Sequence, residues 1–266
     1  MKVGIIGCGK MGTALIQGAV QTGVVNPQRL KGIDPVAAAR EQFVEATGGC
    51  ASERIADLAD SDMVLLCTKP QQACETLNSL AQVAADQPML IISVAAGISV
   101  AALEAAAGPS MRVIRCMPNT PALVGKGAAA YCMGNTATSE DAENAQSLLG
   151  SVGLALELPE SMMDAVTGLS GSGPAYVYLM IESLAEGGVK QGLSWDQALQ
   201  LATQTVLGAA VMVQETGKHP KHLREMVTSP NGTTLAGLSA LEERDFVGVV
   251  HSAVIAATAR SKELGR

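Results

Sequence analysis

A glycine pattern near the start of the chain is the first group of residues that predicts chemistry. Residues 7–12 have the spacing G-x-G-x-x-G and are Gly7, Cys8, Gly9, Lys10, Met11 and Gly12. They directly follow an apolar run at 3–6 and directly precede a helical pattern at 13–20. In that context the glycines allow a tight turn, close approach of the backbone to a pyrophosphate, and close packing of the helix on the strand. Because the free N–H groups of the helix start face the phosphates, we predict a dinucleotide site rather than an empty glycine-rich turn.

Asp34 is the acidic residue expected of such a site. It lies 22 residues after Gly12, at the end of the next apolar run at 30–33. An acidic side chain there typically accepts a hydrogen bond from the ribose 2′-hydroxyl of NAD, and it would repel the 2′-phosphate of NADP. No basic residue follows before Arg40. The alternative is that Asp34 caps a helix begun by Pro35. Since the two roles are compatible, Asp34 favours NADH without excluding NADPH.

Three further loops follow apolar runs and provide candidate cofactor contacts. They are Thr68-Lys69-Pro70, Val94-Ala95-Ala96 and Met117-Pro118-Asn119. The carboxyl ends of parallel strands meet at one edge of a sheet, where the ligands of open α/β folds bind. Small residues there leave room for a flat ring, and prolines lower the cost of ordering a loop. From spacing alone, a solvated lysine explains Lys69 equally well, and an ordinary connection explains 118–121.

The positions of the histidines bear on which class of reduction the chain can catalyse. There is no histidine before His219, whereas a dehydrogenase acting on a hydroxyl group needs a general base, usually histidine or lysine. An imine can bind already protonated, so its reduction requires hydride delivery and orientation but no strong acid. The hydroxyls and N–H groups of 228–234, just before a predicted helix, are suited to binding a carboxylate. From spacing alone, a capped turn is the commoner explanation of that segment.

Composition argues against several classes of protein. The net charge is −7 and aromatic residues make up 2% of the chain, which disfavours nucleic-acid binding. The six cysteines form no C-x-x-C pair and several lie in apolar runs, so we expect reduced, buried thiols and no metal site. No apolar stretch is long enough for a membrane span, and the chain enters a strand at once, without a signal peptide. We therefore expect a cytoplasmic protein that acts on a small molecule.

The candidate residues need a framework of strands alternating with helices. Strands are expected at 3–6, 30–33, 63–68, 89–95, 112–117, 128–133 and 154–158, with an ambiguous edge strand at 50–51. Helical patterns lie between them at 36–46, 71–84, 100–107 and 140–151. Repeated strand–helix–strand units predict a mostly parallel, doubly wound sheet, which is the Rossmann type of α/β domain. The first domain is accordingly placed at 1–158.

After Pro159 the pattern changes to helices only. They are expected at 174–190, 194–215, 223–227, 233–243 and 246–264, which places an all-α domain at 159–266. Several of them, 206–213 most clearly, are apolar on more than one face, although a surface helix should carry one apolar stripe. One explanation is a self-contained bundle, and the other is burial against a second copy of the chain. We favour the second and predict an all-α C-terminal dimerisation domain.

Taken together and in this order, these segments resemble the Δ1-pyrroline-5-carboxylate reductase family. The most specific pieces are 112–127, 164–176 and 222–238, and the resemblance extends over essentially the whole chain. It implies reduction of the cyclic imine L-1-pyrroline-5-carboxylate to L-proline by NADPH or NADH, the last step of proline biosynthesis. It also implies a homodimer with interlocked helical domains, or a larger ring of dimers. The active site would lie between one Rossmann domain and the helices of the dimer.

The resemblance assigns roles that spacing leaves open. Residues 7–12 would hold the pyrophosphate, 68–70 and 94–96 would line the cofactor, and 117–119 would approach the nicotinamide. The substrate would be bound by Glu160, Ser229, Gly232, Thr233 and Thr234. The Thr234 hydroxyl would bond the ring nitrogen, orienting the imine and helping its protonation. Family members that use NADPH usually carry Ser, Thr, Asn or Arg where this chain has Asp34, and Arg54 falls where a side chain can approach a 2′-phosphate.

Two other functions stay open from the residues alone. A β-hydroxyacid-type dehydrogenase, or another imine reductase, would share the two-domain plan. The hydroxyacid enzymes need a lysine on the first long helix of the second domain, where Lys190 occurs only at the far end. A dinucleotide-sensing protein without turnover is disfavoured by the intact segments 117–119 and 233–234. The expectation is an NAD(P)H-dependent imine reductase.

Overall fold

The computed structural model describes residues 1–265 and divides into two compact units. The first, called the sheet unit, contains Met1–Ser172 together with residues 255–265. The second, the helical unit, is Gly173–Val254. The chain therefore leaves the sheet unit once and returns to it within the last helix.

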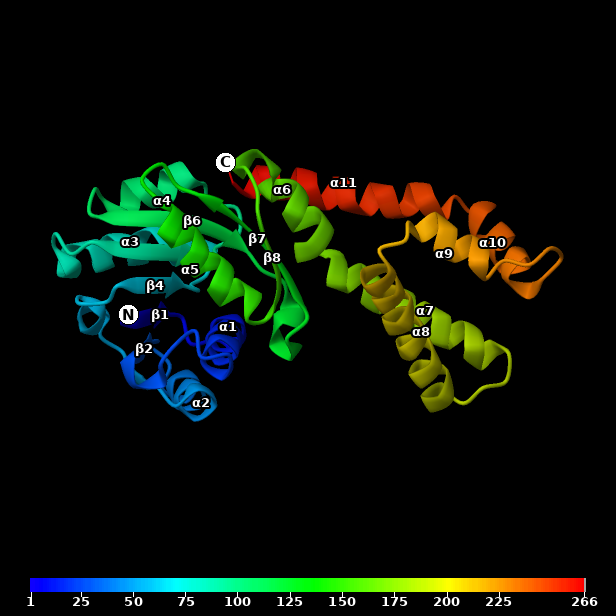
Figure 1. Ribbon diagram of the computed structural model, residues 1–266, viewed down its shortest axis with the longest axis horizontal. Coiled ribbons are helices and arrows are strands. Elements are labelled where there is room, and N and C mark those ends of the chain that lie inside the picture. The colour runs from blue at the N-terminus through cyan, green and yellow to red at the C-terminus, as the bar shows by residue number, and fades with distance from the viewer. Residues whose placement is uncertain (266) are drawn as a thin grey trace. The chain divides into compact units, whose positions relative to one another are not determined.

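An eight-stranded sheet forms the centre of the sheet unit (Figure 1). Its strands are β1 (Val3–Ile6), β2 (Leu30–Ile33), β3 (Cys50–Ser52), β4 (Met63–Leu66), β5 (Met89–Ser93), β6 (Met111–Met117), β7 (Gly127–Met133) and β8 (Gly153–Glu157). Their order is β3-β2-β1-β4-β5-β6-β7-β8. Strands β1 to β6 pair in parallel, whereas β7 pairs antiparallel with β6 and parallel with β8. The direction of winding reverses between β1 and β4, which is where such sheets bind ligands.

Helices cover both faces of this sheet because its central strands are apolar on both sides. Every residue of β1, β4 and β5 is buried, as expected for strands that are covered twice. One face packs against α1 (Lys10–Gln21), α2 (Ala37–Thr47) and α5 (Ser139–Gly150). The other packs against α3 (Pro70–Ala84) and α4 (Val100–Ala107). This burial on both faces holds the carboxyl ends of the strands in place.

The elements predicted for this sheet occur within two residues of their expected ends, except that α1 begins three residues before the predicted start at 13. Two further differences have a physical reason. First, α2 begins at Ala37 rather than near Pro35, because Asp34 forms a turn in which its Oδ1 accepts from Val36 N–H over 2.9 Å. Second, β7 is antiparallel to β6, an orientation that apolar periodicity does not encode. The ambiguous strand at 50–51 does form the sheet edge and extends to Ser52.

The division between the units differs from the predicted one between 158 and 159. The segment 160–172 and the end of α11 (Phe246–Leu264) pack with the sheet unit. Met163 is fully buried in an apolar cluster with Val100 and Cys132, and Ser261 Oγ donates to Asp164 Oδ1 over 2.7 Å. Helical periodicity does not indicate which core a helix packs against. The boundary between the two compact units therefore lies after Ser172, later in the chain than the change of sequence pattern after 158.

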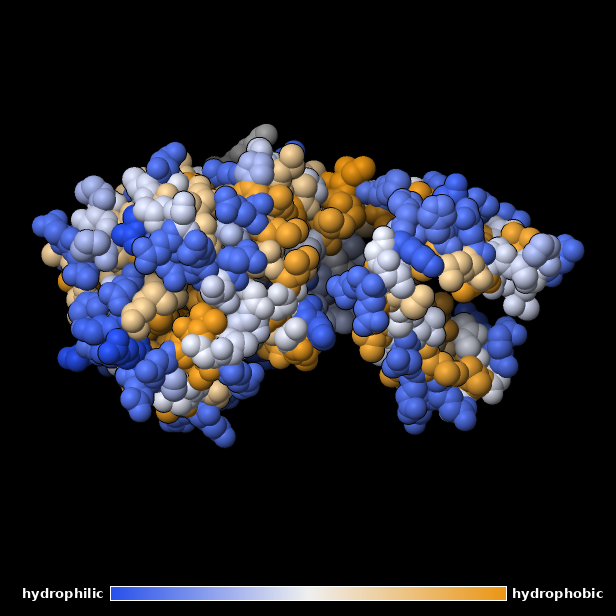
Figure 2. Space-filling model, viewed as in Figure 1, coloured by the Kyte–Doolittle hydropathy of each residue, from blue (hydrophilic) through white to orange (hydrophobic). Residues whose placement is uncertain are grey.

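The helical unit leaves much apolar surface uncovered. It consists of α7 (Gly173–Lys190), α8 (Trp195–Thr216), α9 (Pro220–Met226), α10 (Thr233–Glu242) and the first part of α11, all near the predicted positions. Its buried core is small and consists of Ala185, Ala198 and Ala202. Large apolar side chains such as Leu179, Leu201, Leu207 and Val249 are exposed within the single chain, and Figure 2 shows apolar surface over α7 and α8. Exposed apolar area of this kind marks an interaction surface.

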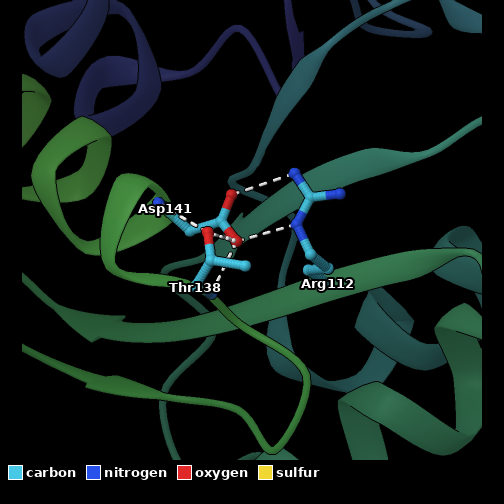
Figure 3. A network of polar contacts seen from close by, with 3 residues as sticks. All are labelled: Arg112, Thr138 and Asp141. Carbon is cyan, nitrogen blue, oxygen red and sulfur yellow. Dashed lines mark hydrogen bonds and ion pairs between the residues drawn. The ribbon is translucent and has the colours of Figure 1, made fainter.

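An ion pair joins β6 to α5 inside the sheet unit (Figure 3). Arg112 Nε and Nη2 donate to the two carboxylate oxygens of Asp141 over 2.7 and 3.0 Å. The Asp141 side chain is 3% exposed, and it also accepts from the N–H and hydroxyl of Thr138 in the capping box of α5. Burial alone would raise the pKa of the Asp141 carboxyl, but the hydrogen bonds from Arg112 and Thr138 outweigh it and hold the pKa below its ordinary 3.8.

Removing this pair is expected to destabilise the protein. Arg112→Ala should lower the free energy of unfolding by about 2 kcal/mol, because Asp141 stays buried without its charged partner. The control Lys2→Ala removes an exposed pair with Asp60 and should cost less than about 1 kcal/mol. Since the folded pKa of Asp141 is depressed, the contribution is complete above about pH 4 and is lost as the pH falls further. Urea unfolding across this range measures both effects, and equal losses for the two variants would contradict the prediction.

Candidate active site

The predicted cofactor residues of the sheet unit come together at one edge. They occupy the loops that follow five parallel strands: 7–12 after β1, Asp34 after β2, 68–70 after β4, 94–96 after β5 and 117–119 at the end of β6. The glycine turn lies where the winding reverses. Gly7 N–H donates to the carbonyl of Ile33 over 2.8 Å, and Cys67 N–H donates to that of Ile6 over 2.7 Å. Ligands of open parallel sheets bind at such a position.

Each glycine of the turn meets a different requirement. Gly7 has a φ of +100°, and a Cβ there would lie 2.6 Å from the Cys67 carbonyl oxygen. A Cβ on Gly12 would collide with the Gly7 carbonyl oxygen and the Ile5 side chain, so α1 packs directly on β1. Gly9 is exposed, and a Cβ on it would meet nothing within 4 Å. The space in front of Gly9, at the N-terminus of α1, is therefore open to a ligand.

The other residues of the turn carry no negative charge that would repel a pyrophosphate. Cys8 is buried, and its N–H donates to Asp34 Oδ2 over 2.9 Å. Burial and the nearby Asp34 carboxylate raise the pKa of the Cys8 thiol to about 12, so the thiol is neutral. Lys10 is exposed and Met11 is half-buried. The turn is therefore electrostatically compatible with a phosphate.

The Thr68 side chain indicates that this edge of the sheet suits a polar ligand. Its Oγ1 is buried and has no hydrogen-bond partner within residues 1–265. Buried polar atoms without a partner are rare in native proteins, and a ligand hydroxyl or phosphate oxygen would satisfy this one. Lys69 is exposed and precedes α3, which Pro70 begins. Together with the open space at Gly9, these residues fit a dinucleotide.

The two remaining loops present different surfaces. Val94 is half-buried, Ala95 is 2% exposed and Ala96 is exposed. In the other loop Met117 is half-buried, and Pro118 and Asn119 are buried. The Asn119 side chain is bonded to other parts of the protein, through Nδ2 to the Ser170 carbonyl and through Oδ1 from Ala128 N–H. The backbone and the Met117 side chain are the parts of this loop that can face a cofactor.

Asp34 retains the capacity to bind a ribose hydroxyl. Its Oδ2 accepts from Cys8 N–H and its Oδ1 from Val36 N–H, both over 2.9 Å. A carboxylate oxygen has a second lone pair, so each can accept one more hydrogen bond. The capping alternative is partly right, since Asp34 stabilises the turn before α2, although Val36 is the N-cap. Arg40 donates to the Asp34 backbone carbonyl over 2.7 Å and not to its carboxylate.

Arg54, the predicted candidate for a 2′-phosphate, already has a partner. Its Nη2 lies 2.8 Å from Asp57 Oδ1, and its side chain is 75% exposed. Ser52 Oγ donates to the other oxygen of Asp57 over 2.7 Å. The Ser52 hydrogen bond and the Arg54 charge lower the pKa of the Asp57 carboxyl. Arg54 follows the strand beside β2, so it lies near the Asp34 end of the edge.

Glu160 lies in the sheet unit and has two partners. Its Oε1 accepts from Val100 N–H over 2.7 Å and from Arg115 Nη1 over 3.0 Å. Arg115 is 8% exposed. A cavity of about 440 Å³ beside the pair is lined by residues that include Gly97, Ser99, Asp164 and Lys262. Sequence reasoning missed Arg115, although an arginine inside the apolar run 111–117 is itself a signal, because a buried charge needs a partner.

The predicted carboxylate-binding residues lie in the helical unit, at the start of α10. Gly232 N–H donates to the Ser229 carbonyl over 3.0 Å, and Asn231 has a φ of 59°, which closes a tight turn. Gly232 is the N-cap of α10, and no side chain caps the first N–H groups. Those N–H groups, from Thr233 and Thr234, are available to an anion. Ser229 and Thr233 are exposed, and Thr234 is half-buried.

Residues 1–265 contain no group of three or more His, Cys, Asp or Glu that could hold a metal ion. None of their helices is long and apolar enough to cross a membrane. The six cysteines are free thiols, but the expectation that they are buried is wrong for Cys50, which lies exposed on the edge strand β3.

Models of two protein families match the chain. Residues 160–264 match the model described as pyrroline-5-carboxylate reductase dimerisation. Residues 2–97 match the model described as NADP oxidoreductase, coenzyme F420-dependent. The second match contains the glycine turn, and the first contains the start of α10.

The chain is also similar, over nearly its whole length, to pyrroline-5-carboxylate reductases of several organisms. A pyrroline-5-carboxylate reductase of Methanosarcina acetivorans is 42% identical over 100% of this chain and 98% of its own length. That of Glycine max is 46% identical over 98% of this chain and 95% of its own. The pyrroline-5-carboxylate reductase structure from Coxiella burnetii has a TM-score of 0.93 at 32% identity, covering 100% and 98% of the two chains. The Plasmodium falciparum pyrroline carboxylate reductase, solved with NADP bound, has a TM-score of 0.88 at 33% identity, with the same coverage.

Proposed function

The chain belongs to the pyrroline-5-carboxylate reductase family, and from this premise we propose that it reduces L-1-pyrroline-5-carboxylate to L-proline with NAD(P)H, the last step of proline biosynthesis. The observation that carries the proposal is identity of 42% over the entire chain to a relative of that name. Both halves of the required site have suitable residues: the glycine turn for the cofactor and the start of α10 for the substrate carboxylate. The chain carries the helical dimerisation domain of the family.

The sheet edge would bind the cofactor along its length. The N–H groups at the start of α1 would face the pyrophosphate across Gly9, and Thr68 Oγ1 would take a ligand oxygen as its partner. The Asp34 carboxylate would accept a hydrogen bond from the 2′-hydroxyl of the adenosine ribose. Ala95, Ala96 and the backbone of 117–119 would line the nicotinamide, which, when bound, supplies the hydride. These contacts would hold the cofactor in one orientation, and such orientation is one of the contributions of the protein to hydride transfer.

The start of α10 would orient the imine. The N–H groups of Thr233 and Thr234 and the hydroxyl of Ser229 would bind the substrate carboxylate, where the positive end of the helix dipole favours an anion. The Thr234 hydroxyl would hydrogen-bond the ring nitrogen and hold its proton there. Glu160 is the remaining predicted substrate contact, although one of its oxygens is bonded to Arg115 and Val100.

The assembly and location of the enzyme follow from the same premise. The exposed apolar surface of the helical unit supports burial against a second copy of the chain. We propose a homodimer, or a larger ring of dimers, in the cytoplasm, without nucleic-acid partners. We also propose that residues 1–158 bind the dinucleotide and that residues 159–266 bind the substrate and form the dimer.

Oxidation of NADPH or NADH in the presence of L-1-pyrroline-5-carboxylate tests the function directly. We expect turnover that depends on the imine and forms L-proline. We expect no oxidation of a β-hydroxyacid by NAD(P)⁺. The hydroxyacid enzymes need a lysine on the first long helix of the second domain, and here Lys190 is only the last residue of α7. Absence of turnover with both cofactors would sink the proposal and favour a dinucleotide-sensing protein, which cofactor binding without turnover would then reveal.

Cofactor choice is expected to depend on Asp34. We predict that the wild type uses NADH well and also accepts NADPH, because the carboxylate accepts from a ribose hydroxyl and repels a 2′-phosphate. Asp34→Ser should shift the ratio of kcat/KM toward NADPH by about tenfold or more, since removing one close like-charge contact is worth ~1–2 kcal/mol. Steady-state kinetics with both cofactors measures the ratio. A strong NADPH preference of the wild type that survives Arg54→Ala would overturn this role of Asp34.

A further inference from the structure

Asn119 connects three segments that lie far apart in the sequence. It follows β6, is 8% exposed, and uses both ends of its amide. Its Oδ1 accepts from Ala128 N–H at the start of β7 over 2.8 Å. Its Nδ2 donates to the Ser170 carbonyl over 3.0 Å. A buried amide with both partners in the protein is poorly placed to contact a ligand directly, and it fixes the segments that it joins.

The segment on the donor side of this connection has an unusual conformation. Thr167–Gly171 forms a π-helical turn, in which Ser172 N–H donates to the Thr167 carbonyl five residues earlier over 2.8 Å. Single π-helical turns are rare and occur frequently at functional sites. The turn directly precedes the point where the chain leaves the sheet unit for α7.

The same turn packs against the loop that would approach the nicotinamide. A Cβ on Gly171 would lie 2.6 Å from Met117 Cε, so the Met117 side chain rests on this glycine. Met117 comes two residues before Asn119 in the chain. The hydrogen bond from the Asn119 side chain to the Ser170 carbonyl and the contact of Met117 with Gly171 therefore hold the loop 117–119 against the π-helical turn at two points.

We propose that Asn119 is a positioning residue, which holds the loop 117–119 against the π-helical turn and so sets the placement of the nicotinamide for hydride transfer. The inference rests on the proposed function. The resemblance to the family implies only that 117–119 approach the nicotinamide, and the inference adds what the Asn119 side chain does there. The phosphate and adenosine parts of the cofactor would be held elsewhere, by 7–12 and Asp34. Loss of the Asn119 bond should therefore impair transfer more than binding, because a displacement of about 1 Å can cost 100-fold in rate.

Asn119→Asp isolates the donor side of the connection. The substituted side chain keeps an oxygen for Ala128 N–H but places a carboxylate oxygen against the Ser170 carbonyl, and the two repel each other. We expect kcat to fall by about 10- to 100-fold with the Kd of NAD(P)H unchanged. The primary isotope effect with deuterated cofactor should rise, because hydride transfer becomes rate-limiting. A purely structural role would lower the melting temperature without changing the isotope effect.

Gly171→Ala provides a second variant that leaves Asn119 untouched. Its Cβ would push on the flexible end of Met117, so the protein can fold while the loop moves. We expect the same pattern of lower kcat and unchanged cofactor Kd. Gly173→Ala is the matched control, because a Cβ there meets nothing within 4 Å of the single chain, and its kcat should equal that of the wild type.

The outcomes separate this inference from the proposed function. If the wild type reduces the imine while Asn119→Asp and Gly171→Ala keep its kcat, the inference is wrong and the function stands. A rise in cofactor Kd with unchanged kcat in Asn119→Asp would indicate direct contact and would also overturn it. Lack of turnover by the wild type would remove the proposed function itself.

Discussion

Gly9→Ala should fold like the wild type and bind NAD(P)H about 100-fold more weakly, because the methyl group would stand where the pyrophosphate approaches the start of α1. Loss of two hydrogen bonds to a charged phosphate is worth about 3 kcal/mol. Gly9 has a φ of −75°, which alanine adopts freely, and a Cβ there meets no protein atom within 4 Å. The effect should therefore be confined to the ligand.

Gly12→Ala is the matched comparison for this prediction. Its Cβ would collide with the Gly7 carbonyl and lie 2.6 Å from Ile5 Cδ1, both within the protein. It should destabilise the fold by about 1–3 kcal/mol, the usual cost of overpacking. Cofactor fluorescence titration and urea unfolding of the two variants measure the two effects. Equal cofactor affinity of Gly9→Ala and the wild type would show that the pyrophosphate does not approach this glycine.

The glycine turn also shows why much of the fold is predictable from the sequence. Backbone requirements at Gly7 and Gly12 follow from local geometry, and the apolar runs of β1, β4 and β5 are buried on both faces. Both features are encoded within a few residues. The same holds for the capping boxes that begin α5 and α8.

Contacts over long separations account for what the sequence does not predict. The resemblance to the family predicts that Asn119 and Glu160 lie close to the ligands, but it does not predict their hydrogen bonds to Ser170, Val100 and Arg115, which span 45 to 60 residues. The return of α11 to the sheet unit depends on Ser261 and Asp164, which are 97 residues apart. No local pattern specifies such pairs. The polar side chains best placed to bind ligands are those, like Thr68, that the protein leaves without a partner.

Thr234→Ala should lower kcat by about 100-fold with little change in the affinity for NAD(P)H, since a positioned proton donor or acceptor contributes about 10²–10⁴ in rate. The reasoning starts from the absence of histidine before His219. Among the candidate substrate residues the one carboxyl group, that of Glu160, is hydrogen-bonded to Arg115 and Val100. The hydroxyl of Thr234 is therefore the group that would hold the proton on the ring nitrogen. Its backbone N–H would stay in the carboxylate site, so substrate binding should weaken less than turnover.

Thr234→Ser distinguishes the hydroxyl from the methyl group. If the hydroxyl carries the effect, the serine variant should retain most of the wild-type kcat while the alanine variant loses it. Rates should be compared at saturating imine and cofactor, with cofactor binding measured separately. A normal kcat for Thr234→Ala would remove Thr234 from the mechanism and leave α10 with carboxylate binding alone. The imine would then have to be protonated before it binds, and kcat/KM should fall at high pH as the protonated substrate is depleted.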